Sequence, residues 1–109
     1  MNIRVLRDFG KWDDIYSHIK LFESLDDAIK ERNIMIKNDL RNIFYNDEKR
    51  NSKLGIENLL KEILIEHNGE LEEQDAYNIY YDPDKMTYTY LDYNDDYESN
   101  MDIVELPIN

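Results

Sequence analysis

Apolar and polar residues alternate with period two near the start of the chain, and this pattern predicts two β-strands. The first expected strand is Ile3–Phe9, and the second is Ile15–Phe22, in which Ile19 and Leu21 share one side. Between them, residues 9–14 ("FGKWDD") have the glycine and the polar side chains that are typical of a turn. The two strands are therefore expected to form an antiparallel hairpin.

Two amphipathic helices are expected next, joined by a polar loop. Ser24 is the predicted N-cap of the first helix, and Asp27 matches a short-armed capping box. The apolar stripe of this helix, with one interruption, is Leu25, Ala28, Ile29, Arg32, Ile36, Leu40 and Ile43. The second helix is expected over Lys53–His67, with Ser52 as its cap and Gly69 as its stop. Its predicted buried face is Ile56, Leu59, Leu60, Ile63 and Leu64.

The last third of the chain alternates again, on both sides of Asp82–Lys85. A type I turn with Pro83 at its second position would close a hairpin there. The expected cross-strand pairs, all on one face, are Tyr81 with Met86, Ile79 with Tyr88, and Tyr77 with Tyr90. We expect residues 70–75 to be a charged linker or a frayed strand start, and residues 92–100 to be a connection. Met101–Ile108 is the last expected strand.

These elements predict one α+β domain over residues 1–109, with the order β-β-α-α-β-β-β. The expected architecture is an antiparallel sheet of about five strands with two helices packed on one face. A chain of 109 residues can enclose one hydrophobic core but not two. The pattern does not indicate the order of the strands in the sheet.

Charge divides the chain into two parts. Residues 1–69 contain 12 Lys or Arg and 13 Asp or Glu, whereas residues 70–109 contain Lys85 alone against 12 Asp or Glu. The net charge of −12 therefore comes almost entirely from residues 70–109, which also contain seven of the nine tyrosines. We interpret the first part as a charge-balanced scaffold and the second as acidic, tyrosine-rich strands.

Residue types that usually carry catalysis or hold a cofactor are sparse in this chain. It has no cysteine, and its two histidines, His18 and His67, are expected to have structural roles. Asp92, Asn94 and Asp96 match the first ligands of an EF-hand loop, but Tyr97 stands where the calcium loop requires glycine. We therefore expect no enzymatic activity, no metal site and no cofactor.

The same composition limits the possible partners. A phosphate backbone and an anionic membrane surface both attract Lys and Arg, so each would repel this acidic chain. The N-terminal residues lack the apolar core of a signal peptide, and the longest aliphatic run, Ile63–Ile65, is too short to span a bilayer. We expect a cytoplasmic protein that binds neither nucleic acid nor membrane directly. Its expected state is a monomer, or a homodimer assembled through the charge-balanced helices.

An acidic and aromatic surface fits a basic partner. Regularly spaced carboxylates favour association with a positive surface, and tyrosine is enriched among the residues that dominate protein interfaces. We therefore hypothesise that the chain binds the basic nucleic-acid-binding surface of another protein, such as a nuclease or a defence effector. The expected partner-binding residues are Tyr80, Asp82, Asp84, Asp92, Tyr93, Asp95, Asp96, Tyr97, Glu98 and Asp102.

The short length, the absence of cysteine, the acidity and the segment "YYDPDKMTYTYLDYNDDYESN" (residues 80–100) resemble the anti-CRISPR and anti-restriction proteins of phages and mobile elements. Many proteins of that class are inhibitors that mimic nucleic acid, and the resemblance implies the same role here. Two other interpretations stay open. The chain could be an immunity protein that neutralises a basic nuclease toxin, or a small protein–protein adaptor or accessory domain whose acidity mainly serves solubility.

Overall fold

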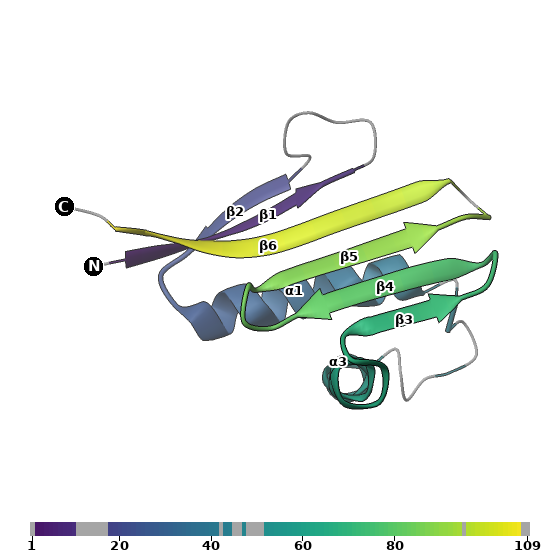
Figure 1. Ribbon diagram of the computed structural model, residues 1–109. Helices are drawn as coiled ribbons and strands as arrows, with labels where there is room; N and C mark the ends of the chain where they lie inside the picture. Colours follow the sequence, from purple (N-terminus) through teal and green to yellow (C-terminus); the bar gives the residue numbers. More distant parts are fainter. Residues whose placement is uncertain are drawn as a thin grey trace.

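The computed structural model describes residues 2–10, 18–41, 43–44, 47, 52–94 and 96–107. Within them the chain forms a six-stranded antiparallel sheet with two helices on one face (Figure 1). The elements are β1 (Asn2–Phe9), β2 (His18–Phe22), α1 (Leu25–Leu40), α3 (Lys53–His67), β3 (Glu70–Glu73), β4 (Tyr77–Asp82), β5 (Thr87–Asp92) and β6 (Tyr97–Pro107). The α+β class is confirmed, and the sheet has one strand more than expected.

The additional strand is β3, where the sequence suggested a charged linker or a frayed strand start. The last turn of α3 ends at Asn68 in the left-handed conformation, with φ 54°, and Gly69 follows with φ 84°. The Gly69 carbonyl then accepts a hydrogen bond from the Tyr81 amide at 2.8 Å. Because the reversal aligns the backbone with β4, the acidic residues that follow pair as a strand despite their low strand propensity.

Both helices begin where the sequence predicts. The Ser24 hydroxyl accepts the Asp27 amide at 3.4 Å, and the Ser52 hydroxyl accepts the Gly55 amide at 2.9 Å. The first helix ends at Leu40 and does not continue to Ile43. The Leu40 carbonyl accepts hydrogen bonds from the amides of Ile43 and Phe44, so the chain leaves α1 through a tightened turn.

The core lies between the helices and the strands β4, β5 and β6. Tyr88 and Tyr90 are each only 1% exposed and belong to one cluster with Ile79 and Met101 from the sheet. The helices supply Ile36, Leu40, Ile56, Leu59, Leu60 and Ile63 to the same cluster. Leu64 was expected on this buried face but is 40% exposed. These two buried tyrosines show that part of the aromatic content of residues 70–109 serves core packing.

The β4–β5 hairpin has a different register from the predicted one. Tyr81 lies opposite Tyr88, and Asp82 lies opposite Thr87, so every predicted pair is shifted by two residues. A shift of two preserves the face of each side chain, because the side-chain period of a strand is two. The turn bond runs from the Met86 amide to the Pro83 carbonyl at 3.3 Å, which makes proline the first turn residue and not the second. Met86 has φ 56° and lies in the loop.

Arg32 interrupts the apolar stripe of α1 and is nevertheless buried, with 4% exposure. Its Nε and Nη2 atoms donate to the Asn33 side-chain oxygen at 3.2 and 3.0 Å, and its guanidinium lies 5.6 Å from the centre of the Tyr81 ring. Burial lowers the pKa of Arg32, although an arginine stays protonated at neutral pH. The arginine therefore takes part in the packing between α1 and β4.

The first and last strands of the chain are neighbours in the middle of the sheet. The strand order is β2-β1-β6-β5-β4-β3, and β1 pairs with β6 from Asn2 opposite Pro107 to Phe9 opposite Asn100 (Figure 1). The last strand begins at Tyr97, four residues before the predicted start, because β5 pairs with this part of the chain as well. The predicted turn at residues 11–14, the start of the second strand at 15–17 and Ile108 lie outside the described residues.

The reversal at Gly69 gives a direct test of the fold. A Cβ atom on this residue would lie 2.7 Å from the Tyr81 carbonyl oxygen, and the positive φ adds strain for any other residue type. We expect Gly69→Ala to lower the free energy of unfolding in urea by about 1–3 kcal/mol. Asn68→Gly, in the adjacent left-handed position, serves as the control and should leave stability unchanged or slightly higher. Equal stability of Gly69→Ala and the wild type would contradict this account of the reversal.

Candidate functional site

One face of the sheet has no helix over it in the described part of the chain. Side chains such as Leu6, Tyr88 and Met101 point towards the helices, and their neighbours along each strand point the other way. In Figure 1, α1 passes behind β4 and β5, on the helix side of the sheet. We call the opposite side the open face. It is a surface built from all six strands, and most of its residues come from segments far apart in the sequence.

The cross-strand register arranges the open face in rows. The first row runs from β3 to β6 and is Glu72, Asn78, Leu91 and Glu98. The second runs from β3 to β1 and is Glu70, Tyr80, Thr89, Asn100 and Phe9. The third runs from β4 to β2 and is Asp82, Thr87, Asp102, Arg7 and Ile19. The next two rows are Val104, Val5 and Leu21, and then Leu106 and Ile3. We call the open-face residues of β3, β4 and β5, together with Glu98, Asn100 and Asp102, the acidic half. Arg7 and Phe9 of β1 lie on the border, and the rest of the open face, made of Ile3, Val5, Ile19, Leu21, Val104 and Leu106, is the apolar half.

A side-chain network holds the aromatic part of the acidic half in place. The Asn78 amide group donates to the Tyr93 hydroxyl at 2.7 Å and to the Tyr80 hydroxyl at 3.0 Å. The Tyr80 hydroxyl donates to Glu72 at 3.3 Å. Desolvation, and then the Glu72 charge, raise the pKa of Tyr80, so its hydroxyl stays a neutral donor. Two tyrosines and a carboxylate therefore keep a fixed arrangement at the β3 edge of the sheet.

The carboxylates of the acidic half differ in how far they are neutralised. Arg7 forms a two-pronged ion pair with Asp102, with distances of 2.7 Å from Nε to Oδ1 and 2.5 Å from Nη2 to Oδ2. Among the described residues of the open face this is the only ion pair, and it marks the border between the two halves. Glu70, Glu72 and Glu98 have no cationic partner in that part of the chain. Their negative charge is available to a partner, whereas that of Asp102 is largely compensated.

A shallow hollow of about 380 Å³ lies where the acidic half meets the end of α3. Three of the predicted partner-binding residues line it, namely Tyr80, Asp82 and Asp84, together with Thr87 and Thr89. The Asp82 carboxylate accepts the backbone amides of residues 84 and 85 at 3.0 and 3.2 Å and so orders the turn. The hollow therefore has rigid acidic and hydroxyl-bearing walls.

The other predicted partner-binding residues are spread more widely. Tyr93, 54% exposed, lies in the β5–β6 turn and reaches the acidic half through Asn78. Asp96, in the same turn, has φ 50°, and Asp95 lies outside the described residues. Asp92 and Tyr97 lie opposite each other on the helix side of the sheet, so they do not belong to the open face. Tyr80, Asp82, Glu98 and Asp102 are the predicted residues that the strands bring together there, and Glu70 and Glu72 join them although the sequence did not predict it.

Tyr97 has a different contact, on the helix side of the sheet, that the sequence did not reveal. Its hydroxyl donates to the Asp39 carboxylate of α1 at 2.7 Å, and the Ser99 hydroxyl donates to Asp8 at 2.9 Å. Burial raises the pKa of Asp39 from 3.8 to about 6, and the nearby Asp8 charge adds to this effect. Helical spacing could have indicated that Asp39 faces the sheet, because it lies seven residues after the buried Arg32 and hence on the same side of the helix.

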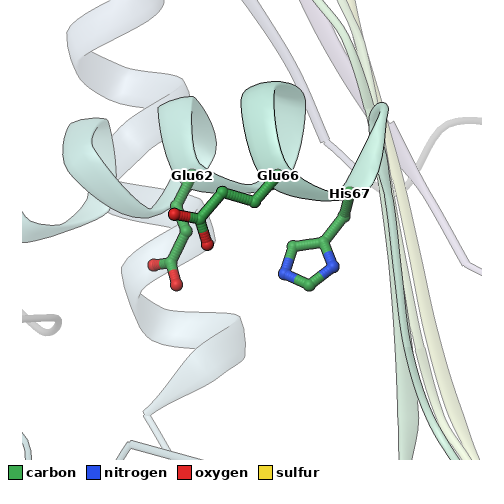
Figure 2. Close-up of side chains that lie close together, drawn as sticks. All are labelled: Glu62, Glu66 and His67. Atoms are coloured by element: carbon green, nitrogen blue, oxygen red, sulfur yellow. The ribbon is translucent and has the colours of Figure 1, made fainter.

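A second cluster, on α3, has the donor types of a metal site. The side chains of Glu62, Glu66 and His67 place one ligand atom each within 4.8 Å of one another. Figure 2 shows the two carboxylates turned towards each other, with the imidazole on the same side of the helix. One nitrogen and two oxygen donors suit zinc or another first-row metal ion, with water completing the coordination. The cluster is largely exposed and lies on α3, away from the open face, so it forms no part of that surface.

The chain matches no protein-family model, no curated protein and no solved structure. No helix in the described residues combines the length and the apolar composition needed to cross a membrane. The open face is therefore the basis for inferring function, and it offers carboxylates, amide groups and tyrosine hydroxyls on a surface ordered by strand pairing.

The Asp39 carboxylate gives a prediction of pH dependence. A folded-state pKa of about 6 against an ordinary value of 3.8 means that the folded protein holds the proton more tightly than the unfolded chain does. The stability from this group is therefore complete below pH 4 and is lost as the pH rises through 6. We expect Asp39→Asn to raise the free energy of unfolding by about 1–2 kcal/mol at pH 7.

Urea unfolding of the wild type and Asp39→Asn at pH 5, 6 and 7 would test this. The difference in free energy of unfolding between Asp39→Asn and the wild type should grow with pH. Asparagine keeps an oxygen that accepts a hydrogen bond from the Tyr97 hydroxyl, and it carries no charge. Tyr97→Phe is the control, since it removes the hydrogen bond that asparagine keeps and leaves the carboxylate. An advantage that stays constant with pH would contradict the raised pKa.

Proposed function

We propose that this protein is a non-catalytic inhibitor whose acidic half binds the basic nucleic-acid-binding surface of another protein. The observation that carries the proposal is the set of carboxylates on one open sheet face, where Glu70 and Glu72 are exposed and Arg7 is the only strand cation among the described residues of that face. The partner would be a nuclease or a defence effector in the cytoplasm. The resemblance to anti-CRISPR and anti-restriction proteins supports the same interpretation.

The geometry of a sheet suits this role. Neighbouring strands are about 4.8 Å apart, and alternate residues of one strand are about 7 Å apart. Strand pairing therefore fixes the carboxylates of β3 and β4 relative to those of β6, with the uncharged open-face residues of β5 between them. A groove that binds nucleic acid presents Lys and Arg to regularly spaced phosphates. Because this arrangement is held by backbone pairing, the chain loses little conformational freedom on binding, and more of the electrostatic attraction contributes to affinity.

The tyrosines contribute shape and specificity. Tyr80 and Tyr93 flank Asn78, and their hydroxyls take part in the same network. Arginine side chains stack on aromatic faces and hydrogen-bond to carboxylates, so this combination fits an arginine-rich partner better than a lysine-rich one. The acidic half therefore offers both contacts that a basic groove can make.

Two alternatives make different use of the open face. An immunity protein against a basic nuclease toxin would use the acidic half in the same way, and only the identity of the target differs. An adaptor would instead bind its partner through apolar contacts. The apolar half supports this alternative, because Ile19, Leu21 and Leu106 are each more than half exposed. Salt separates the two modes, because ion screening weakens charge contacts and spares apolar ones.

The test is capture of cationic nucleic-acid-binding proteins by the immobilised chain. We expect binding to fall steeply between about 0.05 and about 0.5 M salt and to be displaced by added DNA or RNA. The triple variant Glu70→Gln, Glu72→Gln, Glu98→Gln removes three unpaired charges from the acidic half. It should weaken binding of a captured protein by about tenfold or more at low salt, measured by calorimetry.

A matched control carries the same change in net charge on other surfaces. Glu23→Gln, Glu57→Gln, Glu66→Gln alters exposed carboxylates outside the open face and should bind like the wild type. If both triple variants lose the same affinity, only net charge matters and the acidic half is not a specific site. A captured partner that resists high salt and is not displaced by nucleic acid would favour the adaptor.

A further inference from the structure

The apolar half of the open face forms a separate surface on the sheet. Ile19, Leu21 and Leu106 are 56, 64 and 52% exposed, and they surround Val5, which is 5% exposed. They come from β2, β1 and β6, so segments from both ends of the chain meet in one patch that neither of the described helices covers. Scattered exposed aliphatic residues are normal on a protein surface, but a contiguous patch on a sheet usually marks a contact site.

The distribution of charge indicates what covers this patch. None of the six side chains of the apolar half is charged, and the Arg7–Asp102 ion pair closes the border towards the acidic half. A basic partner would find no carboxylate here, so the proposed inhibitor function leaves the patch unexplained. A net charge of −12 makes copies of this chain repel each other across most of their surface. The apolar half lets two copies approach without bringing carboxylates face to face.

We propose that the apolar half is a homodimer interface, in which it packs on the apolar half of a second copy. A two-fold axis that runs roughly along the strands, close to Val5, places β2 of one copy over β6 of the other. Leu21 of each copy then faces the β6 residues of its partner. Two-fold interfaces of this kind are self-complementary, and sheets pack face to face at about 10 Å.

This arrangement separates the acidic halves. The axis lies at β1, and the acidic half extends from β6 to β3 on one side of it. The rotation therefore sends the two acidic halves to opposite ends of the dimer, where both stay uncovered. The sequence suggested that any assembly would use the charge-balanced helices, because strands at the C-terminal end seemed too acidic. The sheet order changes this expectation, since the pairing of β6 with β1 gives β6 an apolar end.

Analytical ultracentrifugation of the full chain over a wide concentration range tests the proposal. We expect a reversible monomer–dimer equilibrium that is kept or tightened as salt rises, because screening reduces the repulsion between the acidic copies. Leu21→Lys should weaken dimerisation by at least about tenfold. This variant reduces the net negative charge, so general electrostatics alone would change association in the opposite direction. Leu106→Lys, on the facing strand, should act in the same way.

The matched control is Ile65→Lys on α3, which adds the same charge at an aliphatic residue that is 79% exposed. It should dimerise like the wild type, and circular dichroism with thermal unfolding would verify that each variant is folded. A chain that stays monomeric at every concentration overturns the proposal. A dimer that is lost in Ile65→Lys and kept in Leu21→Lys also overturns it and points to the helices.

This outcome is independent of the proposed function. The triple variant of Glu70, Glu72 and Glu98 should still dimerise, whereas Leu21→Lys should still bind a basic partner at low salt. If dimerisation fails and salt-sensitive capture holds, only the interface is refuted. If capture fails and dimerisation holds, only the inhibitor function is refuted.

Discussion

The pairing of β1 with β6 is the contact on which the rest of the structure depends. It joins the charge-balanced first part of the chain to its acidic last part, through eight opposed residue pairs between the two ends of the sequence. Without it, the two-stranded β1–β2 hairpin would be separate from the four strands β3–β6, and an isolated hairpin is only marginally stable in water. The same pairing places Arg7 beside Asp102 and Asp8 beside Ser99, so it fixes the polar contacts on both faces.

Strand alternation then separates two uses of the same residue types. Tyr88 and Tyr90 are buried beneath the helices, whereas Tyr80, in the adjacent strand, points to the open face. Carboxylates divide in a similar way, since Asp92 lies on the helix side and Glu70 lies on the open side. Dense acidity and aromatic content in one segment thus serve core packing and surface charge at once, because neighbouring residues of a strand face opposite directions.

The open face combines two kinds of contact whose dependence on salt is opposite. Its acidic half attracts cations and is weakened by screening, whereas its apolar half excludes water and is favoured when repulsion between copies is screened. A dimer built on the apolar half would present two acidic surfaces at its ends, so a basic partner with two sites could be bound by both. The two proposals therefore fit in one assembly although each stands without the other.

The sequence by itself determined the elements that local physics controls. Caps at Ser24 and Ser52, the stop after His67 and the faces of the hairpin strands follow from residues within a few positions of each other. Strand order, the existence of β3 and the early start of β6 were decided by the tertiary structure, because each depends on pairing with a strand elsewhere in the chain. For the same reason, spacing indicated carboxylates on strands but could not show that Glu70 and Glu98 share a face while Asp92 lies on the other.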